Sequence, residues 1–516
     1  MRLFVDCAEA YARELELIAK LFFDDLAFLR DEPDGASWRA RVTVKVGDGD
    51  EPVRAKAELK TLERTYRAEH ARPVRFAGEA RARQKAAKKA AAYVFLDVLE
   101  QATGMRQPWG VLTGVRPTKL YHQFVQAGYT PEEIAAILKS EYRLAPEKVD
   151  LLARIVARQR TVLPDLYELD GEVSLYIGIP FCPTKCAYCT FPAYDIRGQQ
   201  GSVDAFLRAL LDEIAQVGAW LRERDLPVTS IYVGGGTPTS LTAEQLDALL
   251  AALRAHVPHV DRVRELTVEA GRPDTITPEK IAVLKKHGVG RISVNPQSFT
   301  QATLEAIGRH HTVEETIEAF HLARRMGVDN INMDLIIGLP GEDTGHLRHS
   351  LERVGRLEPD SLTIHTLAFK RASTMTQNRE AYRVASREEI HRMMALAASW
   401  TAAHGYHPYY LYRQKNILGN LENVGYAKAG KESIYNIIIM EERHTIIGLG
   451  CGAVSKIIPP GTDKVIRFAN PKEPKAYIEH DRDTLAKKLA LLDEAYGAIG
   501  RRWERRSRKG QIGESR

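Results

Sequence analysis

The chain has 516 residues, of which 44% are hydrophobic and 27% are charged, and its formal net charge is +6. This composition predicts a globular protein of two or three domains, and so modest a charge does not by itself indicate nucleic-acid binding. No apolar run is long enough to span a bilayer, and the N-terminus lacks the pattern of a signal peptide. Five cysteines, three of them close together, argue against a disulfide framework and predict a cytoplasmic protein.

Residues 1–105 are predicted to form an N-terminal α+β accessory domain. A helical pattern covers residues 11–29. Two alternating runs follow, at 38–46 and 52–59, and they flank the turn-forming segment 47–50, so a hairpin is expected.

An alanine-rich basic helix is expected over residues 79–101. Its Arg81, Lys85 and Lys89 are spaced four apart and therefore share one stripe. Such a stripe is typical of a solvated helix face packed on a small sheet, and the alternative is contact with double-stranded RNA.

Residues 106–165 are predicted to form a helical connector. After a segment rich in glycine and proline, Thr130-Pro131-Glu132-Glu133 combines an N-cap threonine, proline at the first helical position and a capping-box glutamate. A second helix is expected to begin at Pro146.

Residues 166–387 alternate short apolar strands with amphipathic helices. Strands are expected at 173–179, 229–233, 265–270, 291–295, 331–337 and 362–367, and helices at 203–221, 243–255, 278–287, 313–325 and 347–357. Strands joined by helical crossovers form right-handed parallel units, so the predicted fold class is α/β, a partial (β/α)6 TIM-like barrel. In such a barrel the chemistry is expected at the carboxyl ends of the strands. A mixed region that covers the substrate is expected over 388–500, and a basic flexible tail over 501–516.

Cys182, Cys186 and Cys189 form a C-x3-C-x2-C motif directly after the first predicted barrel strand. Three thiolates can hold three corners of a 4Fe-4S cluster and leave one iron open to a further ligand. The alternatives are a structural zinc site, which needs a fourth ligand and usually has paired C-x2-C units, or unrelated buried thiols.

Polar or glycine-rich positions lie within, at the end of or directly after the next four predicted strands. They are Gly234-Gly235-Gly236-Thr237, Glu269, Gln297 and Asp334. Taken singly, the glycines could form a turn and the carboxylates could cap helices or make salt bridges. Because these positions meet at one end of the predicted barrel, they favour a site for a small polar ligand.

These motifs resemble the radical S-adenosylmethionine (SAM) superfamily. Within it, the GGGTPT string at 234–239 and the string RISVNPQSF at 291–299 resemble the coproporphyrinogen oxidase branch. The segments 113–119 and 409–416 resemble the HemZ-type oxygen-independent coproporphyrinogen III oxidases (dehydrogenases) of that branch. The resemblance implies that three cysteines bind a 4Fe-4S cluster with one open iron. It also implies contacts to SAM from Tyr176, Gly235, Gly236, Thr237, Glu269, Gln297, Arg309 and Asp334.

The activity implied by the resemblance is oxidative decarboxylation of two propionates of coproporphyrinogen III to vinyl groups, in haem biosynthesis. The implied partners are this porphyrinogen and a low-potential electron donor, and the protein is expected to be a monomer that does not bind nucleic acid. Phe191 stands where the better-known oxidases have a fourth cysteine, and the string Ala270-Gly271-Arg272-Pro273 fits the HemZ type better than the general branch.

Two rival functions remain open. One is a haem-binding chaperone on the same scaffold, although the place of its histidine-containing motif is held here by Ser433-Ile434-Tyr435-Asn436. The other is an RNA-modifying radical SAM enzyme, suggested by the basic N-terminal region.

Several further side chains have two interpretations each. Cys451 is expected to pack among glycines rather than bind a second cluster, and His310 and His311 to shape a loop rather than bind metal. A set of basic residues could pair with substrate propionates or be solvated: Arg413, Lys415, Lys428 and Lys431.

Overall fold

The structure is a computed structural model, and it describes residues 1–23, 26–31, 36–47, 51–73, 80–114, 116–196, 202–370, 373–414 and 417–497. The chain divides into two compact units. The smaller comprises Met1–Ala153 with Gly419–Leu421, and the larger comprises Arg154–Leu418 with the described residues from Glu422 onward. Some predicted features lie outside the described residues: the tip of the hairpin at 48–50, Val115, the side chain of Arg81, Lys415 and the tail at 501–516.

The smaller unit contains a five-stranded sheet in the order β2-β1-β3-β4-β5. Its elements are β1 (Arg2–Asp6), α1 (Glu9–Ala19), β2 (Ala27–Leu29), β3 (Trp38–Lys45), β4 (Val53–Lys60), β5 (Thr65–Arg72) and α2 (Ala80–Thr103). β3 and β4 pair antiparallel, which confirms the predicted hairpin. The helix predicted over 11–29 is wrong at its end, because residues 27–29 form a strand that pairs with β1.

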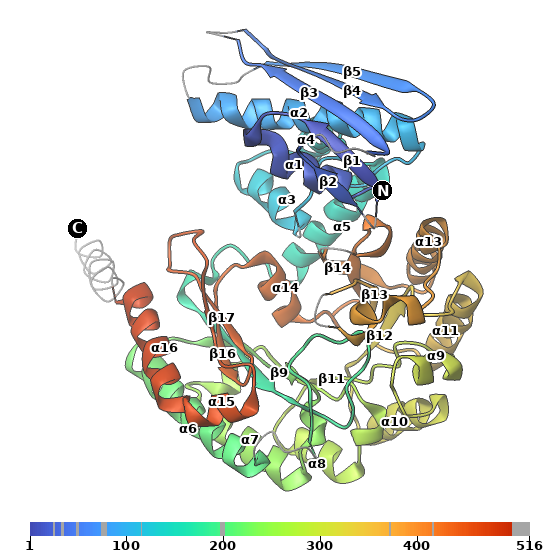
Figure 1. The fold of residues 1–516 in the computed structure, drawn as a ribbon. Helices are drawn as coiled ribbons and strands as arrows, with labels where there is room; N and C mark the ends of the chain where they lie inside the picture. The colour runs from blue at the N-terminus through green and yellow to red at the C-terminus, as the bar shows by residue number, and fades with distance from the viewer. Residues whose placement is uncertain are drawn as a thin grey trace, which may run out of the picture. The chain divides into compact units, whose positions relative to one another are not determined.

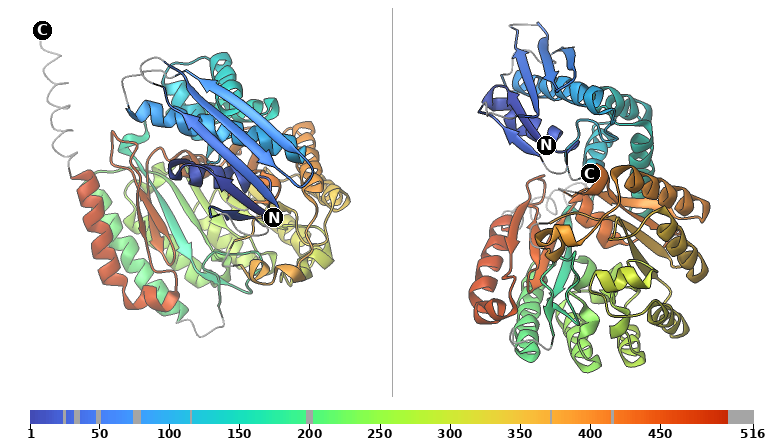
Figure 2. Two further views of the ribbon diagram at one scale, coloured as in Figure 1. Left: turned by 45° about the horizontal axis from the view of Figure 1, so that its top comes forward. Right: turned by 45° about the vertical axis from the view of Figure 1, so that its right-hand side comes forward.

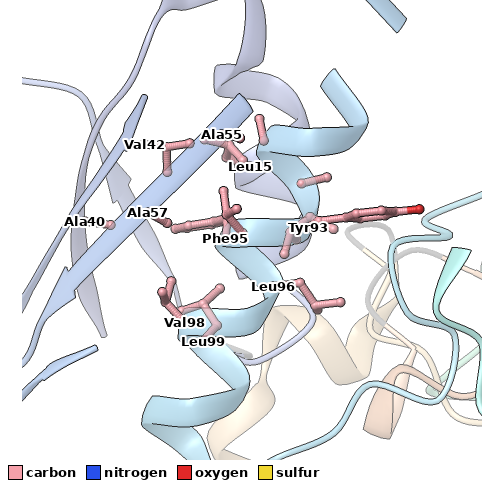
Figure 3. Close-up of a cluster of buried hydrophobic side chains, with 14 of the residues drawn as sticks. Leu15, Ala40, Val42, Ala55, Ala57, Tyr93, Phe95, Leu96, Val98 and Leu99 are labelled. Carbon is pink, nitrogen blue, oxygen red and sulfur yellow. The ribbon is translucent and has the colours of Figure 1, made fainter. Parts of the chain in front are cut away.

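Helix α2 covers one face of this sheet (Figure 3). β4 alternates buried small or apolar residues, such as Ala55, Ala57 and Leu59, with charged ones that are exposed or less buried, so one face of the strand is apolar. Phe95 and Leu99 of α2 are fully buried against that face. The core of this unit therefore follows directly from strand alternation and from one apolar helix face.

The predicted basic stripe of α2 is only partly available to a partner. Lys89 forms an ion pair with Glu141, at 3.6 Å, and its ammonium lies 4.0 Å from the centre of the Tyr142 ring. Lys85 is exposed. The stripe therefore contributes to packing within the smaller unit.

Three helices follow: α3 (Pro117–Gln126), α4 (Pro131–Tyr142) and α5 (Pro146–Val162). The capping box predicted for α4 is confirmed, since the Glu133 amide donates to Thr130 Oγ1 and the Thr130 amide donates to the Glu133 carboxylate. Helix α3 was not predicted, because its proline at the first turn lies in a segment that otherwise resembles a loop. The boundary between the two units falls within α5.

The larger unit is built on an eleven-stranded sheet. Its six middle strands are neighbours in the order β13-β12-β11-β10-β9-β6 and all run parallel, which confirms the predicted partial barrel. They are β6 (Val173–Ile179), β9 (Val228–Gly235), β10 (Glu265–Glu269), β11 (Arg291–Ser293), β12 (Ile331–Ile337) and β13 (Ser361–Thr366). The helices of the crossovers are α6 (Val203–Glu223), α7 (Ala243–His256), α8 (Pro278–Lys286), α9 (Gln301–Ala306), α10 (Val313–Arg325) and α11 (Thr344–Leu357). They lie along the outside of the curved sheet (Figure 1).

Strands after residue 388 continue the same sheet at both edges. β14 (His407–Tyr412) and β15 (Asn423–Ala427) join antiparallel beside β13, whereas β16 (Thr445–Gly450) joins parallel to β6 and leads to β17 (Val454–Ile457) and β18 (Ile466–Ala469). The sequence did not reveal β15 or β16 because every residue in them is buried, so neither alternates. We retain a separate substrate-covering region over 388–500 as a proposal.

Helices at the end of the chain close the larger unit. α15 (Pro474–Glu479) and α16 (Asp481–Tyr496) pack on α6, with α16 in red beside α6 in green (Figure 2). The fully buried Lys488 of α16 forms an ion pair with Glu213 of α6, which also accepts from the Tyr477 hydroxyl at 2.6 Å. The remaining helices are α12 (Thr374–Gln377), α13 (Arg387–Ala403) and α14 (Ile434–Glu441).

Candidate active site

A cavity of about 320 Å³ lies at the carboxyl ends of the barrel strands. Its lining includes every residue predicted from the sequence to bind the cluster or SAM except Tyr176: Cys182, Cys186, Cys189, Gly235, Gly236, Thr237, Glu269, Gln297, Arg309 and Asp334. These residues are spread over 153 positions of the chain, from Cys182 to Asp334. The barrel brings them together because parallel strands all end at the same edge.

The segment with the three cysteines is tied to the loop after α9. The Ala187 amide donates to Ile307 O at 2.9 Å, and the Thr184 hydroxyl donates to Gly308 O at 3.2 Å. Cys182 ends the short strand β7 (Phe181–Cys182), which pairs with β8 (Tyr194–Asp195). Both ends of the segment are therefore held by backbone hydrogen bonds.

The thiols lie in a buried environment that raises the pKa of Cys182 to about 11, although a hydrogen bond with Thr237, at 3.2 Å, opposes this shift. Burial also raises the pKa of Cys189. Among the described residues, no three or more histidine, cysteine, aspartate or glutamate side chains lie close enough together to bind one metal ion. A cubane cluster needs a wider arrangement, since each cysteine binds a different iron.

Gly235 and Gly236 bring the backbone of β9 close to that of β6. Gly235 has φ +112°, and a Cβ there would lie 2.7 Å from Ile179 O. At Gly236 a Cβ would lie 2.6 Å from Phe181 O. Hydrogen bonds from the Gly236 amide to Ile179 O and from the Thr237 amide to Phe181 O, both 2.7 Å, fix this contact. Only glycine fits without moving a strand.

Glu269 is held at the end of β10 by Tyr232, whose hydroxyl donates to Glu269 Oε1 at 2.6 Å. Burial raises the pKa of Glu269 to about 7, with a further contribution from Asp334 and with the Tyr232 hydrogen bond opposing it. The carboxyl group is therefore poised to gain or lose a proton near neutral pH.

This pKa predicts how stability depends on pH. The folded pKa of about 7 lies above the ordinary 4.5, so the folded protein loses stability as the pH rises between these values. Relative to Glu269→Gln, which cannot titrate, the wild type should lose on the order of 3 kcal/mol of unfolding free energy between pH 4.5 and 7.5. Urea unfolding of both proteins across this range measures the difference, and parallel profiles would disprove the raised pKa.

Within the part of the chain that the structure describes, four buried polar atoms around the end of β11 have no hydrogen-bond partner. They are Ser293 Oγ, Asn295 Oδ1, Gln297 Oε1 and Arg309 Nε, and all four residues line the cavity. Gln297 also has φ +65°, an uncommon backbone conformation for a residue other than glycine. Buried polar atoms without partners are costly, so this group indicates a place for a polar ligand.

Asp334 projects into the cavity from β12 beside His365 of β13. Although burial would raise the pKa of Asp334, His365 and Asn332 lower it below its ordinary value. His365 Nε2 lies 3.5 Å from Asp334 Oδ2, and His365 Nδ1 lies 3.3 Å from the Tyr412 hydroxyl. Asp334 therefore stays ionised at neutral pH.

Comparison with known proteins agrees with this geometry. A model of the radical SAM superfamily matches residues 176–354. Over 487 residues the chain is 53% identical to the oxygen-independent coproporphyrinogen-III oxidase-like protein HemZ of Bacillus subtilis (strain 168), covering 94% of this chain and 96% of that protein. The chain belongs to the HemZ-like proteins of the radical SAM superfamily.

Other relatives share parts of this HemZ-like chain. It is 34% identical to the heme chaperone HemW of Bacillus subtilis (strain 168) over 54% of its length and 70% of the chaperone. The solved structure of coproporphyrinogen III oxidase (HemN) from Escherichia coli matches with a TM-score of 0.51 and 22% identity, covering 63% of this chain and 73% of that one. This last match shows a common fold.

The cavity of this HemZ-like protein fits the cofactors of its superfamily. Its three cysteines match in number the thiolate ligands that a 4Fe-4S cluster with one open iron would need. The glycine contact at 235–236 leaves bare backbone beside them, and the unpartnered atoms around β11 offer donors and acceptors to a polar molecule such as SAM. Within the described ranges, none of the helices combines the length and the apolar character that crossing a bilayer requires.

Tyr176 does not line the cavity. Its ring stacks on Tyr232 and Tyr435, with both centroid distances 6.3 Å. Tyr232, which was not predicted, lines the cavity in its place. Tyr176 and Tyr232 are partners across neighbouring strands, so their positions along the sheet are equivalent and sequence alone does not tell them apart.

Arg272, His365 and Lys370 also line the cavity and were missed as candidate residues. Arg272 pairs with Asp274, and Arg309 donates to Asn295 O and Gly271 O. The position of His365 at the end of the sixth barrel strand could have revealed it, because the five earlier strand ends all carry site residues.

The other candidate residues lie outside the cavity lining: Arg413, Lys428, Lys431, Cys451, His310 and His311. Lys428 lies over the Tyr406 ring at 5.6 Å, and Lys431 donates to Asp329 O at 2.7 Å. Cys451 is 3% exposed and its thiol donates to Lys472 O at 3.2 Å, consistent with the packing interpretation. His311 is fully buried with no metal-binding group among the described residues, and burial lowers its pKa to about 3.

Proposed function

We propose that this HemZ-like protein is a radical SAM oxidoreductase, a coproporphyrinogen dehydrogenase that oxidatively decarboxylates two propionates of coproporphyrinogen III to vinyl groups and yields protoporphyrinogen IX. Each propionate would lose carbon dioxide, one hydrogen atom that passes to the adenosyl group of SAM and one electron that passes to an acceptor. The observation that carries the proposal is the cavity in which three cysteines, a glycine contact and unpartnered buried polar atoms meet. The 53% identity to a coproporphyrinogen-III oxidase-like protein over nearly the whole chain supports the substrate. A monomer in the cytoplasm that receives electrons from a low-potential donor belongs to the same proposal.

In this proposal Cys182, Cys186 and Cys189 hold the cluster. When bound, the cluster and SAM supply a carbon-centred radical that abstracts hydrogen from the substrate. Backbone at Gly235 and Gly236 lies against SAM, while Glu269 and Asp334 receive its hydroxyl or cationic groups.

The remaining cavity residues position this assembly. Arg309 is fixed by Asn295 O and Gly271 O and keeps Nε free for an acceptor such as a carboxylate. Within the described ranges the amide oxygen of Gln297 lacks a partner, so it can accept from a bound amino or hydroxyl group.

The test is anaerobic incubation of the reconstituted protein with SAM, a reductant and coproporphyrinogen III. We expect 5′-deoxyadenosine release together with a stoichiometric vinyl product. Release of 5′-deoxyadenosine without any porphyrinogen product would exclude the decarboxylase assignment and leave the radical chemistry standing.

The two rival functions are tested in the same preparation. A haem chaperone would bind haem stably, but Ser433 here caps α14 and contacts Glu265 at 2.9 Å, in the place of the histidine motif. An RNA-modifying enzyme would bind RNA in a salt-sensitive way that is lost on removing residues 1–105. Either result without porphyrinogen turnover would favour that rival.

A further inference from the structure

The residues assigned above to SAM occupy only one side of the cavity. They lie in or directly after the strands β9 to β12, or, for Arg309, in the loop after α9. The other side is formed by β13 and β14 and by the residues that follow each of them, with His365, Leu367, Lys370, Tyr412 and Gln414 in its lining. We call these five residues the β13–β14 wall. No part of the cofactor assignment uses this wall, so it is available to the substrate.

The cations of the cavity differ in what they already bind. Arg272 forms a two-pronged contact with Asp274, with both distances 3.0 Å. Arg309 is fixed by two carbonyl groups, and Arg291, at the start of β11, donates to Ser361 Oγ at 3.1 Å. Lys370 is different, because among the described residues its ammonium has no hydrogen-bond or ion-pair partner. Burial lowers the pKa of Lys370, and the charge of the Cys189 thiolate opposes this shift.

Phe191 adds an apolar surface to the same cavity. Its side chain is 57% exposed, although it is a large aromatic residue. It follows Cys189 by two positions, where the better-known oxidases of the family resemblance have a cysteine. An aromatic ring that lines a cavity can pack against another flat ring, such as a pyrrole.

We propose that the β13–β14 wall recognises the substrate, with Lys370 pairing to a propionate carboxylate and Phe191 contacting the pyrrole rings. The inference rests on the proposed function, since it takes the ligand to be a tetrapyrrole that carries propionates. An ammonium and a carboxylate form a charge-assisted hydrogen bond, and partial burial strengthens it relative to bulk water. Lys370 is thus a residue that determines specificity, and it is itself neither a predicted cluster ligand nor a predicted SAM contact.

The test measures binding of coproporphyrin III, the oxidised and fluorescent form of the substrate, by the reconstituted full-length protein. Lys370→Gln should raise the Kd by at least about tenfold, the effect of losing a hydrogen bond to a charged group. Lys370→Arg should recover most of the affinity. The matched control is Lys428→Gln, because Lys428 is similarly half-buried but lies outside the cavity lining, and this variant should bind like the wild type.

The tetramethyl ester of coproporphyrin III separates charge from shape. The ester should bind the wild type and Lys370→Gln with similar affinity, whereas Phe191→Ala should weaken binding of both the acid and the ester. The Kd for SAM should be the same in all variants. If Lys370→Gln binds the acid like the wild type, or only shifts the reduction potential of the cluster, the inference is wrong.

Turnover measured in the same samples separates this inference from the proposed function. A wild type that forms protoporphyrinogen IX while Lys370→Gln binds normally would overturn the inference alone. The proposed function alone would be overturned by a different result. In it, the wild type binds the acid more tightly than the ester, Lys370→Gln loses this preference, and the wild type forms no vinyl product. The same preference with haem as the probe would support carboxylate recognition and favour the chaperone as the function.

Discussion

Cys186→Ala should give a protein that folds but does not hold the catalytic cluster. Two remaining thiolates, Cys182 and Cys189, leave a cubane with only two protein ligands, which is not enough to retain it with one iron open for SAM. We expect the iron content after anaerobic reconstitution to fall to a small fraction of the wild-type value. SAM cleavage should fall by more than the roughly 10- to 100-fold that is lost with an outer-shell partner of a metal site.

The matched control is Cys451→Ala. Cys451 is buried like Cys186, but it lies outside the cavity lining, and its thiol donates to the Lys472 carbonyl. Its replacement should cost about 1 kcal/mol of unfolding free energy through the lost hydrogen bond and leave iron content unchanged. Iron and sulfide analysis, visible absorbance and electron paramagnetic resonance of the reduced protein measure the outcome. A Cys186→Ala protein that assembles the same SAM-binding cluster would refute the ligand assignment.

The barrel was predictable because its strands and helices have separate local patterns. β6 and β12 have the predicted ends, and α10 does as well, since Thr312 caps it and Glu315 completes a capping box. Strand order followed from the right-handed parallel crossover. The sequence therefore predicted which strand ends would meet, and with them most of the cavity.

The remainder depends on contacts that are remote in sequence. β16 pairs with β6 although more than 260 residues separate them, and its fully buried residues carry no period of two. The residues of β2 lie at the end of a helical sequence pattern, but they form a strand because they pair with β1. Such tertiary pairings override local preference, and no local pattern reveals them.

The same limit applies to the site. Glu269, Gln297 and Asp334 were predicted as site residues from the sequence motifs that contain them. Tyr232, His365 and Lys370 also line the cavity but were not predicted. Tyr232 becomes a site residue through its hydrogen bond to Glu269, and Lys370 through the absence of a partner within the described residues. Both properties belong to the folded arrangement, not to residue type or spacing.

Gly235→Ala should disable the SAM side of the cavity without removing any ligand atom. The residue has φ +112°, which an L side chain rarely adopts, and the new Cβ would lie 2.7 Å from Ile179 O. Because the obstructing atom is backbone, β6 and β9 must separate, and stability should fall by more than about 1 kcal/mol. A shift of about 1 Å in the backbone that faces the cofactor can cost about 100-fold in rate, so SAM cleavage should fall by about that factor.

Gly405→Ala distinguishes backbone strain from close approach. Gly405 also has positive φ, +74°, but a Cβ there would meet nothing within 4 Å, and the residue lies between α13 and β14, outside the cavity lining. The Gly405→Ala variant should lose about 1–2 kcal/mol of stability, because alanine must adopt the left-handed conformation, and it should still cleave SAM. Titration of SAM and release of 5′-deoxyadenosine from both variants, each with a full iron content, measure the difference. If Gly235→Ala binds and cleaves SAM as Gly405→Ala does, the glycine contact is needed only for folding, and SAM must lie elsewhere in the cavity.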